Sequence, residues 1–183
     1  DVSISENNAK KLGFSKVSQL KLAVSQRIRE FTAGGGYLFA MCSAPDSYDV
    51  ALAAENIDIC DVMFDGDGAD AHANEHLNYQ NCFAFTNFSI VTNPYEYEIS
   101  NIDVTTTRKV SMANDFFTLF DFSAKWDPVP TMLCQDHERI ITGFMGQTTA
   151  FRNDQIKSSV LIMGENKAIG EVRYIHGEYG KGT

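Results

Sequence analysis

The segment from residue 34 to residue 54 constrains this chain most, because a glycine turn, an apolar run and a polar turn follow one another in it. A helix predicted over residues 7–32 from its apolar stripe ends at the glycine turn of residues 34–36. Residues 37–42 form a continuous apolar run, as expected for a strand buried on both faces. Turn and capping residues follow, and residues 48–54 predict a short helix. This order of elements indicates a parallel α/β sheet.

Beyond residue 55 the pattern changes to shorter, β-rich pieces. An acidic, glycine-rich stretch at residues 65–70 predicts an exposed loop. With no repeat or linker in sight, the sequence predicts one α/β domain over residues 1–183, a mostly parallel sheet with a β-rich insertion. The strand-like runs cover residues 83–88, 97–104, 116–122 and 131–135, and a hairpin is predicted from residues 158–163 and 169–176 around Glu165-Asn166-Lys167.

Composition and charge exclude two classes of partner. Apolar residues make up 44% and charged residues 21% of the chain, which is the composition of a globular domain. A net charge of -9 cannot neutralise phosphates, so we expect no nucleic-acid partner. No apolar stretch reaches the roughly 18 residues of a membrane span. The chain begins at Asp1 without a signal-peptide pattern, and residues 180–183 would feed another strand, so we expect a fragment of a longer protein.

Cys42 is the main candidate for a catalytic residue. A nucleophile on a strained strand-to-helix turn needs small residues two positions before and after it, and Ala40 and Ala44 occupy those positions. The helix N-terminus would stabilise a thiolate, and the Ser43 N–H would point towards a developing oxyanion. Such an elbow places Cys42 in sparsely allowed backbone space at the end of a strand. The alternative is a small buried cysteine at a strand end.

A cysteine nucleophile also needs a base and a group that orients the base. His176 ends the last predicted strand, and Glu178 stands two residues beyond it, where it could orient the imidazole. His137 is the second candidate for the base, since it follows the run at residues 131–135. The alternative for both histidines is a structural or surface role. His72 and His76 lie in a polar stretch and are expected to be solvated.

The sequence predicts no metal site and no cofactor. The run Asp65-Gly66-Asp67-Gly68-Ala69-Asp70 resembles a calcium loop, but its spacing departs from the calcium-binding pattern, and His76 stands where that pattern has a glutamate. A glycine-rich acidic loop is the interpretation that we adopt. The glycines at residues 34–36 precede a strand instead of joining a strand to a helix, so they do not form a phosphate-binding loop.

Several long runs carry a resemblance to a known family. They are residues 35–44, 120–133, 143–151, 163–168 and 174–183, and the resemblance that they carry covers most of the chain. These runs resemble a bacterial family that carries the name asparagine synthetase B, within the class I glutamine amidotransferase-like and ThuA-like group. The resemblance implies a flavodoxin-like α/β fold, with helices on both faces of a mostly parallel sheet. It also implies a single amidotransferase-like domain that binds a small-molecule substrate or ligand, and export to the periplasm or cell surface.

The resemblance leaves two functions open. Full-length family members carry, beyond the position of Thr183, a segment that resembles the His-x-Glu end of an amidotransferase triad. In that case Cys42 is a potential nucleophile for amide or acyl chemistry, and the triad partners lie outside this chain. The alternative is a non-catalytic ligand-binding or interaction domain with a degenerate triad. The synthetase activity in the family's name is not expected, because this chain begins with Asp1 and lacks the Ser-Gly-Gly-x-Asp-Ser loop.

Overall fold

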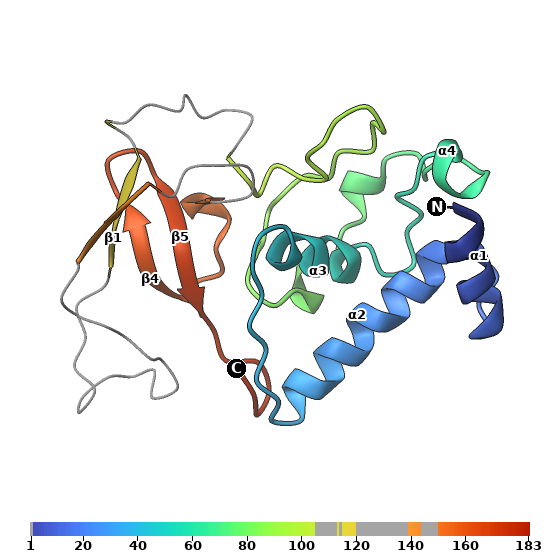
Figure 1. The fold of residues 1–183 in the computed structure, drawn as a ribbon, viewed down its shortest axis with the longest axis horizontal. Coiled ribbons are helices and arrows are strands. Elements are labelled where there is room, and N and C mark those ends of the chain that lie inside the picture. Colours follow the sequence, from blue (N-terminus) through green and yellow to red (C-terminus); the bar gives the residue numbers. More distant parts are fainter. Residues whose placement is uncertain (1, 105–112, 114, 120–138, 144–149) are drawn as a thin grey trace.

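A computed structural model describes residues 2–104, 113, 115–119, 139–143 and 150–183 of the chain. Figure 1 shows a group of helices on one side and a small sheet on the other. Among the described residues, four α-helices come from the first 65 positions, and the strands lie between residues 116 and 176. The two halves of the chain therefore form different kinds of structure. In the described part, no helix combines the length and the apolar character needed to cross a membrane.

The N-terminal region forms two helices where the sequence predicted one over residues 7–32. They are α1 (Val2–Lys11) and α2 (Val17–Ala33). The break comes at Gly13, which has a φ of 87°, a left-handed conformation that glycine adopts without cost. The Phe14 N–H donates back to the Ala9 carbonyl at 2.9 Å and closes the end of α1. The predicted end of the second helix is confirmed, because α2 is capped by Gly34.

The apolar run at residues 37–42 is not a strand buried on both faces, which corrects the prediction. Tyr37, Phe39 and Met41 are 56%, 58% and 67% exposed, and the run lies outside the five-stranded sheet. Helix α3 (Ala44–Ala53) begins directly after this run, earlier than the predicted residue 48. The prediction of extended chain, tight turn and helix is thus right in order. It is wrong about burial, because no neighbouring strands cover the run in the described part.

The sheet is antiparallel, so the predicted fold class is wrong. Its strand order is β2-β1-β4-β5-β3, and every pairing in it is antiparallel. A parallel pair needs a crossover of about a dozen residues or more, whereas β4 and β5 are joined by the turn at residues 167–170. Figure 1 shows the helices beside the sheet, not on both of its faces as in a flavodoxin-like fold. The strands are β1 (Phe116–Leu119), β2 (Ile140–Thr142), β3 (Phe151–Arg152), β4 (Leu161–Asn166) and β5 (Glu171–His176).

The structure confirms some of the predicted β segments and not others. The hairpin is confirmed as β4 and β5, but its turn lies at residues 167–170, and the predicted turn residues Glu165 and Asn166 belong to β4. Part of the run at residues 116–122 is confirmed as β1, and the run at residues 131–135 lies outside the described residues. Residues 83–88 and 97–104 make only isolated bridges, such as Phe85 with Ile156. Short helical turns complete the structure: α4 (Val62–Asp65), η1 (Ala73–Glu75), η2 (Tyr79–Asn81) and η3 (Asn153–Gln155).

The core joins α3 to β3 and to residues 73–104, which we call the central segment. Val50 and Ala53 of α3 pack in one cluster with Phe85, Phe88 and Phe151. Burying such aromatic side chains stabilises a domain by about 1.5–3 kcal/mol each. The central segment contributes to the core through side chains and isolated bridges, although it forms no strand of its own.

A buried carboxylate fixes the position of the central segment. Asp49 of α3 is fully buried, and it accepts hydrogen bonds from the N–H groups of Phe83, Ala84 and Phe85 at 2.6, 2.8 and 2.8 Å. Burial raises the pKa of Asp49, and these hydrogen bonds partly offset the rise. Three adjacent backbone donors thereby join two segments that lie more than 30 residues apart in the sequence.

Candidate functional site

The backbone at Cys42 has the sparsely allowed conformation that the sequence predicted, although the run before it is not the predicted strand. Cys42 has a φ of 60°, between the extended run that ends at Met41 and the first residue of α3. Left-handed backbone is uncommon outside glycine and is enriched in Asn, Asp and His. The other described non-glycine residues with positive φ are Asn56, His72 and Asn87, which belong to those types. The exposed Cys42 therefore stands out as a strained residue at a turn.

The turn around Cys42 leaves one backbone donor available. The Ala44 N–H donates to the Met41 carbonyl at 3.2 Å, and the Ser47 N–H donates to the Ser43 carbonyl at 3.0 Å. The Ser43 N–H makes no hydrogen bond to any described residue. It lies at the N-terminus of α3, where backbone donors and the helix dipole favour negative charge.

A cavity of about 450 Å³ lies beside the turn. The run that leads into Cys42 lines one part of it, and the end of β5 with the residues that follow lines another. Cys42, His176 and Glu178 all line this cavity, so three of the predicted site residues come together. His137 lies outside the described residues, so its predicted role stays a prediction.

The last residues of the chain hold the two walls of the cavity in place. The Leu38 N–H donates to the Thr183 carbonyl at 2.7 Å, and the Thr183 N–H donates to the Gly36 carbonyl at 3.1 Å. The Lys181 N–H donates to the Ala33 carbonyl at the end of α2 at 2.9 Å. A side chain at Gly182 would collide with backbone atoms of Thr32 and Gly36, so glycine permits this close approach.

The imidazole of His176 interacts with Thr183. Its Nδ1 lies 3.3 Å from the Thr183 hydroxyl, which donates in turn to the Gly177 carbonyl at 3.2 Å. No hydrogen bond joins Glu178 to His176 in the described part of the chain. The structure thus brings Glu178 to the same cavity without the orienting contact that we predicted. His72 and His76 are exposed, as predicted, and His72 pairs with Glu75 at 3.0 Å.

Sequence reasoning missed Arg173, which also lines the cavity. Its side chain is 0% exposed, and its Nη2 pairs with Glu171 Oε2 at 2.8 Å. Its Nε and Nη1 are buried without a hydrogen bond, and the guanidinium lies 5.8 Å from the centre of the Phe117 ring. Two charged residues two positions apart in an apolar strand point to one face, and that pattern could have drawn attention to them.

Sequence reasoning also missed Asp46, in the first turn of α3. The residue is 4% exposed, and its Oδ1 accepts the Ser47 N–H at 2.9 Å. Burial raises the pKa of Asp46 from 3.8 to about 7, the Ser47 N–H lowers it in part, and the charges of Asp103 and Asp49 add to the rise. An ionisable group that titrates near neutral pH therefore lies one helical turn after Cys42.

The cavity is thus lined by a strained cysteine, a histidine, a glutamate and a buried arginine. The Ser43 N–H, which has no hydrogen-bond partner among the described residues, lies next to Cys42 but outside the lining of the cavity. A thiol and donors for negative charge therefore lie close together, and acyl-transfer chemistry uses groups of both kinds. Comparison with known proteins does not assign the chain to a family. No family model matches the chain, and neither a curated protein nor a solved structure matches it.

Proposed function

We propose that Cys42 is the nucleophile of an amide- or acyl-transfer reaction, as in the class I glutamine amidotransferase-like proteins that residues 35–44 resemble. The observation that carries the proposal is the left-handed backbone of this exposed cysteine between an extended run and a helix N-terminus. Strain of about 1–3 kcal/mol persists only where the surrounding structure enforces it, and it concentrates at functional sites.

The chemistry proceeds through a thioester. The Cys42 Sγ, once deprotonated, attacks the carbonyl carbon, and the Ser43 N–H donates to the oxygen as negative charge develops on it. The C–N bond then breaks, and the amine leaves with the proton that the base took from the thiol. Water hydrolyses the thioester, which releases a carboxylic acid and restores the thiol. His176 is the described residue that we assign as this base, since it lines the same cavity.

Arg173 supports a substrate that carries a carboxylate as well as an amide. Its Nε and Nη1 are buried without a hydrogen-bond partner among the described residues, and they point to different edges of the guanidinium. Either donor can form a charge-assisted hydrogen bond to a carboxylate oxygen, and burial strengthens such a bond. An amino-acid amide such as glutamine has both groups, and it fits the family that the sequence resembles.

A second candidate function is ligand binding without turnover. The histidine in the cavity contacts Thr183 instead of an acidic residue, so nothing in the described part fixes the imidazole for proton transfer. Tyr37, Phe39 and Met41 also give the cavity an apolar wall. These observations favour a domain that keeps the elbow and binds a small molecule.

Labelling with a glutamine-analogue diazoketone at neutral pH tests the first proposal. We expect Cys42 to be alkylated at least about tenfold faster than Cys60, as measured by mass spectrometry of peptides over time. Arg173→Gln should slow this reaction but leave the reaction of Cys42 with neutral iodoacetamide unchanged. If Cys42 reacts with the diazoketone no faster than Cys60, it is not an activated nucleophile.

The same assay separates the two functions. Turnover predicts release of ammonia from a small amide, and the release should disappear in Cys42→Ser. Binding alone predicts that the amide protects Cys42 from iodoacetamide while no ammonia is released. Cys82→Ser is the control, because Cys82 is buried in the core, away from the surface.

A further inference from the structure

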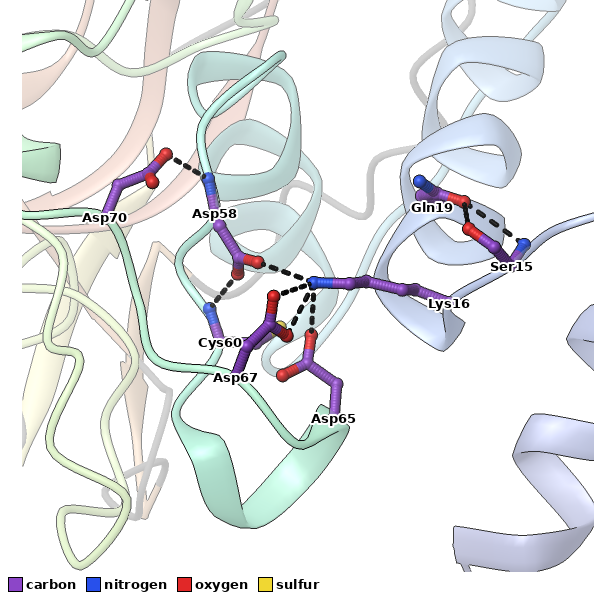
Figure 2. Close-up of polar contacts among 8 residues, drawn as sticks. All are labelled: Ser15, Lys16, Gln19, Asp58, Cys60, Asp65, Asp67 and Asp70. Atoms are coloured by element: carbon purple, nitrogen blue, oxygen red, sulfur yellow. Dashed lines mark hydrogen bonds and ion pairs between the residues drawn. The ribbon is translucent and has the colours of Figure 1, made fainter.

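A second group of chemically reactive side chains lies outside the lining of the cavity. Asp58, Cys60 and Asp65 each place one ligand atom within 4.8 Å of the others. We call these three residues the Asp58–Cys60–Asp65 cluster. Figure 2 shows them pointing toward a common centre, into which Lys16 reaches from the start of α2. The cluster combines two carboxylates and one thiol, which are all metal ligands.

Asp65 is the unusual member of the cluster. Its side chain is only 5% exposed, and both carboxylate oxygens are buried without a hydrogen bond. The Lys16 Nζ comes no closer to Asp65 than 3.9 Å. Burial and the negative charge of Asp58 raise the pKa of Asp65. Buried carboxylates are normally hydrogen-bonded, because an unsatisfied one has lost its water without replacement. Figure 2 shows the Asp65 carboxylate directed at the centre of the group.

The Lys16 ammonium lies among the carboxylates of the cluster, where a bound cation would also lie. Its Nζ lies 3.2 Å from Asp58 Oδ2 and 2.6 Å from Asp67 Oδ1. The hydrogen bond to Asp67 is the main reason that the pKa of Lys16 is raised. One ammonium faces the three carboxylates of Asp58, Asp65 and Asp67, so negative charge remains in excess. The lysine side chain is 31% exposed, so it can move out into solvent.

Backbone contacts fix the cluster in place. The Cys60 N–H donates to Asp58 Oδ1 at 2.9 Å. The Asp58 N–H donates to Asp70 Oδ2 and the Asp70 N–H donates to the Asp58 carbonyl, both at 2.8 Å. Gly66 ends α4 with a φ of 93°, which turns the chain back directly after Asp65. The ligands are therefore held by their own loop before any ion binds, which lowers the entropic cost of binding.

We propose that Asp58, Cys60 and Asp65 bind a divalent transition-metal cation of the zinc type, with Lys16 as a counterion that the metal displaces. Oxygen and sulfur ligands together suit Zn²⁺, whereas Ca²⁺ and Mg²⁺ prefer oxygen alone. The bound metal replaces the proton of the Cys60 thiol, which is released to solvent. Three protein ligands leave one position of a tetrahedral site open to water or to Asp67.

Titration of the 183-residue protein with Co²⁺ under reducing conditions tests this proposal. Cobalt bound to a thiolate gives a strong near-ultraviolet charge-transfer absorption, and Zn²⁺ should abolish it by competition. Cys60→Ser should remove the band. Asp65→Asn should weaken binding by more than the roughly 10- to 100-fold that loss of an outer-shell partner costs. Cys42→Ser and Asp61→Asn are the matched controls, and both should keep the band.

Lys16→Met provides a second measurement that does not depend on losing a ligand. Removing the competing ammonium should tighten cobalt binding by about tenfold or more. Circular dichroism of each variant verifies that it is folded. The proposal is overturned if wild-type protein gives no thiolate band, if the band persists in Cys60→Ser, or if Lys16→Met binds cobalt no more tightly than wild type. Binding of Mg²⁺ or Ca²⁺ in preference to Zn²⁺ would also overturn it.

Discussion

Asp49 and Asp65 are both buried aspartates, yet their surroundings differ. Asp49 accepts hydrogen bonds from three consecutive backbone N–H groups. Both oxygens of Asp65 are buried without a hydrogen bond of good geometry, and only the Asp67 N–H and the Lys16 charge, 3.9 Å away, offset part of the rise in its pKa. Burial raises the pKa of each. A buried carboxylate that accepts several hydrogen bonds can join two parts of the fold. A buried carboxylate that accepts few has lost its water without gaining equivalent partners from the protein.

Asp46 lies between these two extremes. It is 4% exposed, and its Oδ1 accepts a hydrogen bond from the Ser47 N–H. Its neighbours Asp103 and Asp49 are also acidic and make its ionisation harder. The three aspartates therefore form a series in which support from backbone hydrogen bonds decreases from Asp49 to Asp46 to Asp65.

Replacing Asp49 should have the largest effect on stability. Asp49→Ala leaves the N–H groups of Phe83, Ala84 and Phe85 buried without acceptors, so we expect a loss of about 4 kcal/mol. Asp49→Asn keeps one acceptor oxygen and should lose about half as much. Urea unfolding of both variants gives the two free energies. A loss below about 1 kcal/mol for Asp49→Ala would show that the three hydrogen bonds do not hold the central segment in place.

The second largest effect should be the contribution of Asp46 to the pH dependence of the free energy of unfolding. Its pKa is 3.8 in the reference state and about 7 in the folded protein, so the folded state binds more protons between these values. Stability from this group is fully present below pH 4 and is lost as the pH rises towards 7. Between pH 5 and pH 8 the loss should be about 2 kcal/mol.

Asp46→Asn isolates this contribution from those of the other buried carboxylates. The variant cannot ionise at this position, so its stability should fall less steeply than that of the wild type over the same range. Urea midpoints at pH 5, 6, 7 and 8 measure the difference. Parallel pH profiles for wild type and Asp46→Asn would mean that Asp46 is ionised at neutral pH in the folded protein.

The sequence predicted the features that depend on neighbouring residues. Small residues around Cys42 predicted its strained backbone, and the glycines after residue 33 predicted the end of α2. The hairpin of β4 and β5 followed from two apolar runs around a polar turn. Each of these signals lies within a few residues of the structure that it specifies, so local sterics and hydrogen bonding decide the outcome.

Features that depend on distant residues could not be predicted in the same way. An apolar run indicates a strand but not the direction of its partner, so the sheet was assigned the wrong direction. The exposure of Phe39 depends on which segments cover it, and not on its own neighbours. The spacing of residues 65–70 argued against calcium, but Asp58 and Cys60 reach Asp65 from outside that run. The unpaired donors of Arg173 beside the cavity likewise depend on how distant segments pack around it.

Asp65→Asn gives the smallest effect, and its sign tests the comparison of the two buried aspartates. Without metal, replacing a buried carboxylate that accepts few hydrogen bonds removes an unfavourable charge, so we expect a gain of about 0.5–1 kcal/mol. Asp49→Asn should change stability in the opposite direction, because its three donors lose a charged acceptor. Urea unfolding in the presence of a chelator measures both. Adding Zn²⁺ should then stabilise the wild type more than Asp65→Asn, since only the wild type keeps all three proposed ligands. A loss of stability in Asp65→Asn with the chelator present would mean that Lys16 compensates the Asp65 charge at 3.9 Å, and that the fold already supplies its partner.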